Sequence, residues 1–301
     1  MAVFSDNARG AILMSGAAAA YTINDSFMKA ASDEAPLFQL MFLRGILMVL
    51  LLGLVAWRSG ALRFRMARRD RALLWLRNVS EVAASLFFLT ALFNMPIANA
   101  TAIMQVLPLT IALGGALFLR QPLGWRRFCA IGIGFAGVLL IVRPDARGID
   151  AYALSALAAV AALTLRDLVT FRMPHGIPSS LMALSATGCV TVATGVLSIA
   201  VDWQAVSVLM AIQLVSSAVM LNVAFVLSIQ VMRVGDIGAV APFRYTSILW
   251  ALILGWAVFG DWPDLWMLSG SAIVAGAGVF TLLREARLAR NERRQRERAA
   301  T

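Results

Sequence analysis

Charged side chains are scarce in this sequence. Of its 301 residues, 14% are Asp, Glu, Lys or Arg, whereas 60% are hydrophobic. A soluble domain usually carries about 25% charged residues. This composition excludes an ordinary soluble protein and indicates an integral membrane protein.

Histidine and cysteine are also scarce, which limits the chemistry that the chain can perform. His175 is the single histidine, and Cys129 and Cys189 both fall within apolar segments. The sequence has no HExxH motif, no cluster of metal ligands and no glycine-rich loop ahead of a Gly-Lys pair. Two isolated thiols imply no disulfide framework. We therefore predict that the chain is not an enzyme and needs no cofactor or metal, and we exclude an ATP-driven pump for this chain alone.

Apolar residues gather into ten segments. At about 1.5 Å per residue, each is long enough to cross a hydrocarbon core about 30 Å thick as a helix. A helix satisfies its own backbone hydrogen bonds, which lipid cannot do. The fold class is therefore predicted to be all-α. The ten expected transmembrane helices are 10–30, 36–57, 72–92, 97–119, 124–142, 151–171, 178–200, 207–231, 237–259 and 264–284.

The basic residues predict an orientation. Of the 26 Lys and Arg residues, 19 fall on one side of the expected membrane, near the two termini and after the even-numbered helices. By the positive-inside rule that side is cytoplasmic, so the net charge of +10 describes topology rather than nucleic-acid binding. We expect a multi-pass protein of a bacterial-type inner membrane with both termini in the cytoplasm. The basic tail 285–301 should anchor this topology; binding of anionic lipid or a regulator is the alternative.

Sparse identities recur along the chain at a nearly constant offset. A shift of 142 places Asp25 on Asp167, and a shift of 141 places Phe118 on Phe259. Each repeat would hold five helices, an odd number, so the second is expected to lie inverted in the membrane. Inverted repeats are typical of secondary transporters that work by alternating access. The expected units are an N-terminal repeat (1–145), a C-terminal inverted repeat (146–284) and the tail (285–301).

Several features follow the pattern of a known family. They are Arg44 in the second helix, the run SLFFLTALFNMPIANATAIMQVLPL, Pro108, and glycine-rich fifth and tenth helices that end in IVRP and LLRE. Over about residues 10 to 284 the chain resembles the EamA-type transporters of the drug/metabolite transporter superfamily. One departure is visible. The family commonly has a Gly-Glu pair after the fourth and ninth helices, where this sequence has Arg120-Gln121 and Gly260-Asp261.

Ionisable residues inside a membrane are costly and mark candidate sites. Glu81 lies near the middle of the third helix and shares a helical face with Asn78. We predict that Glu81 holds a substrate ammonium or titrates with a proton gradient; the alternative is a neutralising pair with Arg77. Arg244 in the ninth helix is the candidate for binding a substrate carboxylate. Its alternative role is to pair with Glu81 or Asp236.

Uncharged polar residues complete the predicted site. Gln105 shares a polar stripe of the fourth helix with Thr101 and Pro108, and either lines the cavity or joins two helices by a hydrogen bond. Pro242 should bend the ninth helix or free a backbone acceptor. The residues predicted to shape the substrate site, beside Glu81 and Arg244, are Asn78, Gln105, Asn222, Tyr21 and Tyr245, and those predicted to be gating or structural are Asp25, Asp167, Pro108, Pro242 and Asn24.

Three further residue sets carry packing predictions. Asp25 either acts in gating or pairs with Lys29, four residues later, and Arg44 is expected to pack with its charge neutralised by an acid. Glycines of the fifth and tenth helices should let two helix backbones approach closely. These glycines are Gly132, Gly134, Gly137, Gly270, Gly276 and Gly278.

The family resemblance implies that helices one to four and six to nine surround a central cavity, with helices five and ten at the side. Members of this superfamily export amino acids or move drugs, nucleotide derivatives or S-adenosylmethionine. We therefore expect a secondary transporter that exports amino acids or similar small zwitterionic metabolites. A multidrug or nucleoside-type metabolite transporter is the first alternative, and a membrane scaffold without a transport path is the second. The expected partners are a small-molecule substrate and membrane lipid; a proton as coupling ion, and a monomer or a homodimer, are left open.

Overall fold

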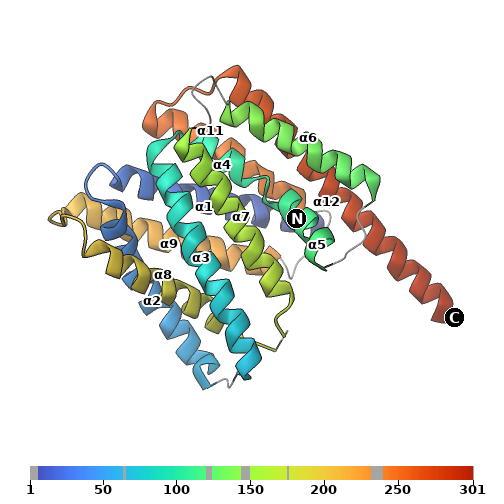
Figure 1. Cartoon of the computed structure of the whole chain (residues 1–301), viewed down its shortest axis with the longest axis horizontal. Helices are drawn as coiled ribbons and strands as arrows, with labels where there is room; N and C mark the ends of the chain where they lie inside the picture. The colour runs from blue at the N-terminus through green and yellow to red at the C-terminus, as the bar shows by residue number, and fades with distance from the viewer. Residues whose placement is uncertain are drawn as a thin grey trace, which may run out of the picture.

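The structure is a computed structural model that describes residues 6–63, 66–119, 124–143, 150–174, 176–231 and 240–300. Within these ranges the chain forms helices and no strand (Figure 1). The predicted all-α fold class is confirmed. His175 and the hinge Arg120-Gln121 lie outside the described residues.

The first half of the chain supplies six α-helices and one 3-10 turn. The fourth membrane segment is divided between two of these helices. The elements are α1 (Asp6–Ala31), α2 (Leu37–Arg58), η1 (Ala61–Arg63), α3 (Arg68–Asn94), α4 (Ile97–Met104), α5 (Leu107–Leu119) and α6 (Trp125–Val142).

The second half follows the same order. Its fourth membrane segment begins with a 3-10 helix instead of a separate α-helix. The elements are α7 (Ala151–Phe171), α8 (Ser179–Ser198), α9 (Val208–Val231), η2 (Ala241–Tyr245), α11 (Thr246–Phe259) and α12 (Leu265–Ala300).

Nine segments of the described chain are long and apolar enough to cross a membrane. The helix outside this group is α1, which carries Thr22, Asn24, Asp25 and Lys29 in its second half. Two of these polar side chains are buried: Thr22 is 2% exposed and Asn24 is 3% exposed. The α1 helix therefore hides its polar groups inside the bundle, and with it the described chain has ten spans.

The helices of the two halves pack against each other in a regular way. The principal pairs are α1 with α9, α3 with α7, α2 with α8, α4 with α11, and α6 with α12. When the spans of each half are numbered one to five, these pairs join first to third, second to second, fourth to fourth and fifth to fifth. Exchanging the two halves leaves every pair in place. Figure 1 shows α6 and α12 side by side at one edge of the bundle.

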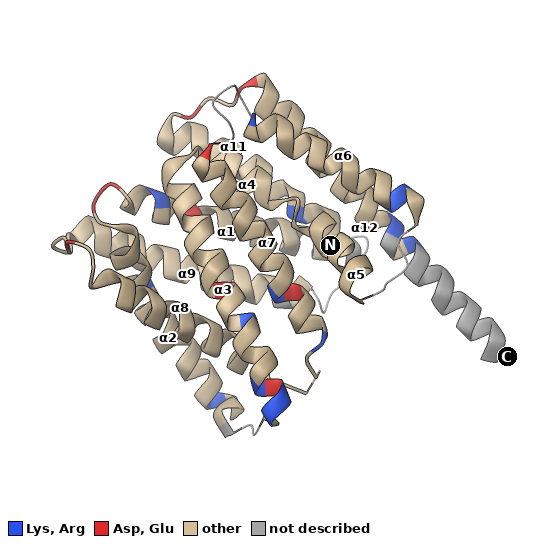
Figure 2. Ribbon diagram, in the orientation of Figure 1, with Lys and Arg blue, Asp and Glu red and all other residues tan. Residues whose placement is uncertain are grey.

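Successive spans alternate in direction, so the bundle has two faces. We call the face that holds the 31–37, 94–97, 198–208 and 259–265 connections the Lys29 face. We call the opposite face, where α12 continues as a basic helix, the tail face. Figure 2 shows most Lys and Arg at the tail face and the acidic connections at the Lys29 face.

Glycines allow the closest helix contact, between α6 and α12. A Cβ atom on Gly270 would lie 2.6 Å from the carbonyl oxygen of Gly137, and one on Gly137 would lie 2.9 Å from that of Gly270. Gly134 and Gly278 are also filled by neighbouring side chains. The prediction was wrong for Gly132 and Gly276, where a Cβ would meet nothing within 4 Å. Those two point away from the contact because they fall on the other side of their helices.

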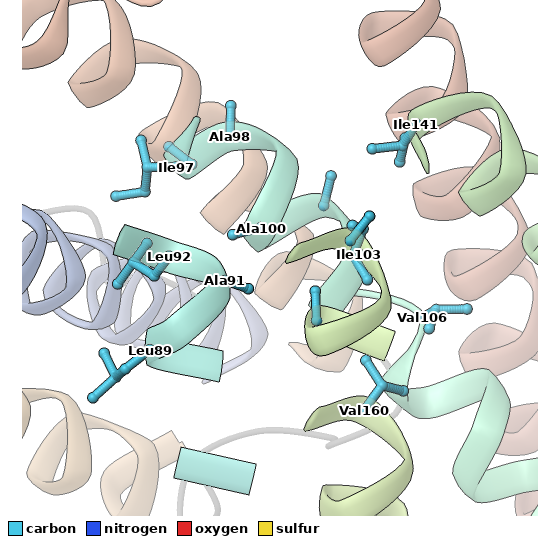
Figure 3. Close-up of a cluster of buried hydrophobic side chains, with 14 of the residues drawn as sticks. Leu89, Ala91, Leu92, Ile97, Ala98, Ala100, Ile103, Val106, Ile141 and Val160 are labelled. Carbon is cyan, nitrogen blue, oxygen red and sulfur yellow. The ribbon is translucent and has the colours of Figure 1, made fainter. Parts of the chain in front are cut away.

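A dense hydrophobic core surrounds the end of α3 and the whole of α4. Leu92, Ile97, Ile103 and Val106 are fully buried there (Figure 3). Val160 of α7 packs into the same cluster from the second half. This core holds the short helix α4 in place beside the point where the fourth span is interrupted.

Candidate functional site

The fourth span is interrupted in its middle. Helix α4 ends at Met104 and α5 begins at Leu107. Pro108 has no N–H and cannot bond the carbonyl of Met104, so the regular hydrogen-bond ladder stops here. Gln105 and Val106 close the turn with backbone bonds to Thr101, Ala102 and Ile103. The predicted break point at Pro108 is therefore present.

The ninth span is irregular at its start. The 3-10 helix η2 covers Ala241–Tyr245 with Pro242 in its first turn, and the α-helix begins only at Thr246. The preceding residues 232–239 lie outside the described chain, and so do Asp236 and the Gly238 carbonyl that Pro242 was predicted to free. Both fourth spans thus contain irregular backbone, which membrane proteins tolerate where it is buried or lines a cavity.

These two irregular points touch each other. The Gln105 Nε2 donates a hydrogen bond of 3.0 Å to the backbone carbonyl of Arg244. Gln105 is buried. Its side chain therefore joins the two halves of the molecule, which is the helix-joining role that the sequence left as one of two alternatives. Thr101, one turn earlier, is also buried, and its hydroxyl has no partner among the described atoms.

A network of four charged side chains joins α3 to α7. Arg166 Nη1 lies 3.2 Å from Glu81 Oε2 and 3.4 Å from Oε1. The same guanidinium bonds the neighbouring Asp167 through Nε at 2.8 Å and Nη2 at 2.7 Å. Arg77 Nη2 lies 3.9 Å from Glu81. Two cations and two anions balance, so the network can be held at membrane depth.

The corresponding interface between α1 and α9 carries a neutral version of this network. Asn24 Nδ2 donates to the neighbouring Asp25 Oδ1 at 2.9 Å, and Asn24 Oδ1 accepts from Ser217 of α9 at 2.7 Å. Arg44 of α2 reaches the same oxygen at 3.4 Å. Arg44 also interacts electrostatically with Asp25, as expected for a packed arginine neutralised by an acid.

The two networks share one design. Asn24-Asp25 and Arg166-Asp167 stand 142 residues apart, and in each pair the first side chain donates to the second. In each pair the first residue also reaches across to the partner helix. The first half uses an amide and a hydroxyl, whereas the second half uses a guanidinium and Glu81. Charge at depth is therefore concentrated on the α3–α7 interface.

Tyr21 stands between the two interfaces. Its ring packs edge-on to Phe225 with centroids 6.1 Å apart. Its hydroxyl is hydrogen-bonded to Ser228 of α9 and lies within electrostatic range of Arg166 and Arg244. The tyrosine thus brings α1 and α9 next to the charged side chains of α7 and η2.

Arg244 differs from the other arginines at depth because it has no ion-pair partner among the described carboxylates. Glu81, one of its two predicted alternative partners, is occupied by Arg166 instead. The other, Asp236, lies outside the described residues. The Arg244 guanidinium therefore adds a positive charge to the region around Tyr21.

Three predicted site residues have local partners. Asn222 Nδ2 donates to the Ala218 carbonyl of its own helix at 2.9 Å and lies 3.3 Å from Met48 Sδ. Asn78 Nδ2 lies 3.7 Å from Cys189 Sγ, and its Oδ1 is buried without a described partner. Tyr245 is buried against α12, where its hydroxyl fills the space beside Gly278. Tyr245 therefore packs the ninth span onto the tenth.

Lys29 does not pair with Asp25, so that alternative was wrong. Its Nζ donates to the backbone carbonyls of Leu92 at 3.0 Å and Met95 at 2.6 Å. The last carbonyls of a helix have no intrahelical partner and attract a cation. The end of α3 lies close enough to supply them.

A pocket of about 440 Å³ lies away from these networks, between α11 and α12. It is lined mainly by apolar side chains, and the spans that form it are both long enough to cross a membrane. Representative lining residues are Pro242, Tyr245, Ile248, Leu268 and Ser271.

Sequence reasoning did not include Arg166, Ser217 or Ser228 among the site residues. Arg166 carried a usable signal, since it is a charged residue in an apolar helix directly before Asp167. The two serines carried none, because a hydroxyl in a membrane helix can bond its own backbone.

Comparison with known proteins gives the class of this molecule. The fold and its paired irregular spans are those of a polytopic membrane protein of small-metabolite transporter type. Residues 8–143 match the EamA-like transporter family, which confirms the resemblance over these residues. A solved crystal structure has a TM-score of 0.64 at 16% identity, covering 91% of this chain and 97% of its own.

Curated relatives are all named as carriers of small molecules. An S-adenosylmethionine uptake transporter of Rickettsia bellii is 22% identical over 63% of this chain and 65% of its own length. A riboflavin transporter of Vibrio cholerae is 26% identical over 71% of this chain and 72% of its own. The pseudopaline exporter of Pseudomonas aeruginosa is 22% identical over 90% of this chain and 94% of its own. The alignment thus spans a little under two thirds of the first of these relatives.

Proposed function

We propose that this protein is a secondary transporter that exports amino acids or similar small zwitterionic metabolites across an inner membrane by alternating access. The observation that carries the proposal is the contact of the two irregular fourth spans through Gln105 and Arg244, beside a charge network at depth. Discontinuous helices that meet near a buried polar site are typical of secondary transporters.

The order of the helix pairs supports two inverted halves, which we place at 1–145 and 146–284. Exchanging the halves preserves every principal pair. A structure of this kind can interchange the conformations of its halves and so open alternately to each side. The tail 285–301 then lies on the cytoplasmic face with the other basic connections.

The charge network supports a zwitterionic substrate. In the network, Arg166 lies closer to Asp167 (2.7 and 2.8 Å) than to Glu81 (3.2 and 3.4 Å). A substrate ammonium could take the place of Arg166 at Glu81, because Arg166 would keep Asp167 as its partner. The carboxylate of the same substrate would then bind Arg244, which has no described acid partner. Both ends of a zwitterion would be neutralised without leaving a buried charge unpaired.

The names of the relatives agree with this substrate class in part. S-adenosylmethionine is itself an amino-acid derivative, whereas riboflavin is not. One relative is named for uptake and another for export, so the direction of transport follows the gradients rather than the fold. We propose export for this chain, and leave a proton as the coupling ion to be tested at Glu81.

Counterflow into proteoliposomes of the purified protein tests the proposal. The panel holds labelled amino acids, S-adenosylmethionine, riboflavin and a lipophilic cation, each with and without a pH gradient. We expect accumulation of a zwitterion, its loss in Glu81→Gln, and more residual transport in Arg244→Lys than in Arg244→Gln. Asp70→Asn removes a carboxylate from the same helix at the tail face and should transport normally.

Two outcomes would replace the proposal. Movement of the lipophilic cation alone would favour a multidrug transporter, and movement of riboflavin alone a transporter of nucleoside-type metabolites. No movement of any compound would favour a membrane scaffold. If Glu81→Gln transports with its full dependence on the pH gradient, Glu81 is not the proton carrier.

A further inference from the structure

A cation stands near the end of the first span in each half of the molecule. Lys29 lies in the last turn of α1, and Arg172 is the C-cap residue of α7. The two positions are 143 residues apart, close to the repeat offset of 141 to 142. Because the two helices end on opposite faces, one cation lies at the Lys29 face and the other at the tail face.

Each cation reaches the end of the fourth span in the other half. Lys29 Nζ lies 5.5 Å from the centre of the Phe259 ring, at the end of α11. Arg172 Nη2 donates a 3.0 Å hydrogen bond to the carbonyl of Phe118, in the last turn of α5. The two phenylalanines are 141 residues apart and coincide in the repeat. The structure therefore contains two equivalent bridges between its halves, one at each face.

The bridge at the Lys29 face is the stronger one. Lys29 also holds the Leu92 and Met95 carbonyls at the end of α3. Asp261 follows Phe259 through a left-handed Gly260, φ 68°, which directs its N–H to the Gly255 carbonyl. This turn places the Asp261 carboxylate within electrostatic range of Lys29.

The bridge at the tail face has fewer partners. Arg172 is exposed, and its described contact is the single Phe118 carbonyl. In the sequence, Arg120-Gln121 stands where the other half has Gly260-Asp261, so an arginine takes the place of the acid. The electrostatic support that Lys29 receives from Asp261 is therefore not repeated by that pair.

Further contacts between the halves lie on the Lys29 face. Gln39 and the backbone of Gln204 exchange two hydrogen bonds of 2.7 and 2.9 Å. Glu34 accepts from Ser207, and Arg143 pairs with Asp264. These contacts close the rim around the Lys29 bridge in this conformation.

We propose that Lys29 and Arg172 are paired gate residues, each holding one face of the transporter closed. Opening one face requires its bridge to break while the opposite bridge forms or tightens. The unequal bridges make closure of the Lys29 face the favoured resting state. This inference rests on the alternating-access part of the proposed function and is independent of the substrate class.

The test measures access to the centre of the protein from each face. Thr101→Cys is the reporter, in a background with Cys129 and Cys189 replaced by Ala. The Thr101 hydroxyl is buried without a described partner, so the thiol replaces no hydrogen bond. A membrane-impermeant maleimide is applied to right-side-out and inside-out vesicles. Val206→Cys on the exposed rim identifies which vesicles present the Lys29 face.

We expect Lys29→Gln to raise the labelling rate of the reporter several-fold from the Lys29 face and to lower it from the tail face. Arg172→Gln should raise labelling from the tail face, by a smaller factor. Lys29→Arg keeps the cation and should resemble the parent. Arg58→Gln removes an exposed cation from the tail face and should change neither rate.

A matched pair of phenylalanine variants separates gating from loss of folding. Lys29 contacts the ring of Phe259, whereas Arg172 contacts only the backbone of Phe118. Phe259→Leu should therefore raise labelling from the Lys29 face, and Phe118→Leu should not alter labelling from either face. Equal increases at both faces, or no change in Lys29→Gln and Phe259→Leu, would overturn the proposal. The assay needs no substrate, so its failure is distinct from failure of zwitterion transport.

Discussion

Removing the Arg166 side chain tests whether the charge network between α3 and α7 acts as one unit. The wild-type network is neutral, with two arginines and two carboxylates. Arg166→Gln leaves Glu81 and Asp167 with one cation, Arg77, whose nearest approach to Glu81 is 3.9 Å. Glu81→Gln leaves the opposite excess. Each single variant therefore places one uncompensated charge at the interface.

The magnitude follows from the burial of the network. Breaking a fully buried ion pair from one side costs about 3–5 kcal/mol, and a hydrogen bond to a charged group contributes about 1.5–3 kcal/mol. The side chains of the network are 15% to 27% exposed, so they are partly screened. We therefore expect each single variant to lose about 2–3 kcal/mol of folding stability.

The double variant Arg166→Gln with Glu81→Gln distinguishes coupling from separate effects. It restores neutrality, because Arg77 and Asp167 remain. Its loss should fall short of the sum of the two single losses by about 1–2 kcal/mol. The assay is the apparent midpoint of thermal unfolding of the purified protein in one detergent. Additive losses would show that the two side chains do not interact, and would remove the displacement step from the proposed mechanism.

Three further predictions rest on single contacts. Gly270→Ala should cost about 1–3 kcal/mol in thermal stability because the added methyl group meets the α6 backbone, whereas Gly276→Ala, which meets nothing, should be neutral or better. Gln105→Leu should lose about 1 kcal/mol with its bond between the halves, and Thr101→Val should lose less because that hydroxyl has no described partner. Pro108→Ala should allow the fourth span to become more regular, raising thermal stability while lowering the counterflow rate; an unchanged rate would separate the break from transport.

Much of the fold could be predicted because it depends on local chemistry. Lipid forces each long apolar run to satisfy its own backbone, so run length alone predicts a helix. The weakest of the ten spans is α1, because its polar residues cluster in one half. The break at Pro108 could be predicted for the same reason: a missing N–H acts on the residue four positions earlier.

The partners of polar side chains could be predicted less well. An i+4 rule offers Lys29 to Asp25, but the rule considers only one helix. In the folded chain the end of α3 presents two free carbonyls to Lys29, and Arg44 approaches Asp25. Arg77 does lie near Glu81 as the spacing predicts, yet the shorter contact comes from Arg166 on another helix.

The sequence by itself determined the membrane class, the ten spans, the 141 to 142 residue offset and the family resemblance, because hydropathy and proline act within a few residues of themselves. Only the tertiary structure decided which distant groups meet. It brought Gln105 to the Arg244 carbonyl, Arg166 to Glu81 and Lys29 to Phe259. Those contacts depend on how helices from the two halves are rotated and paired, and no spacing along the chain specifies that rotation.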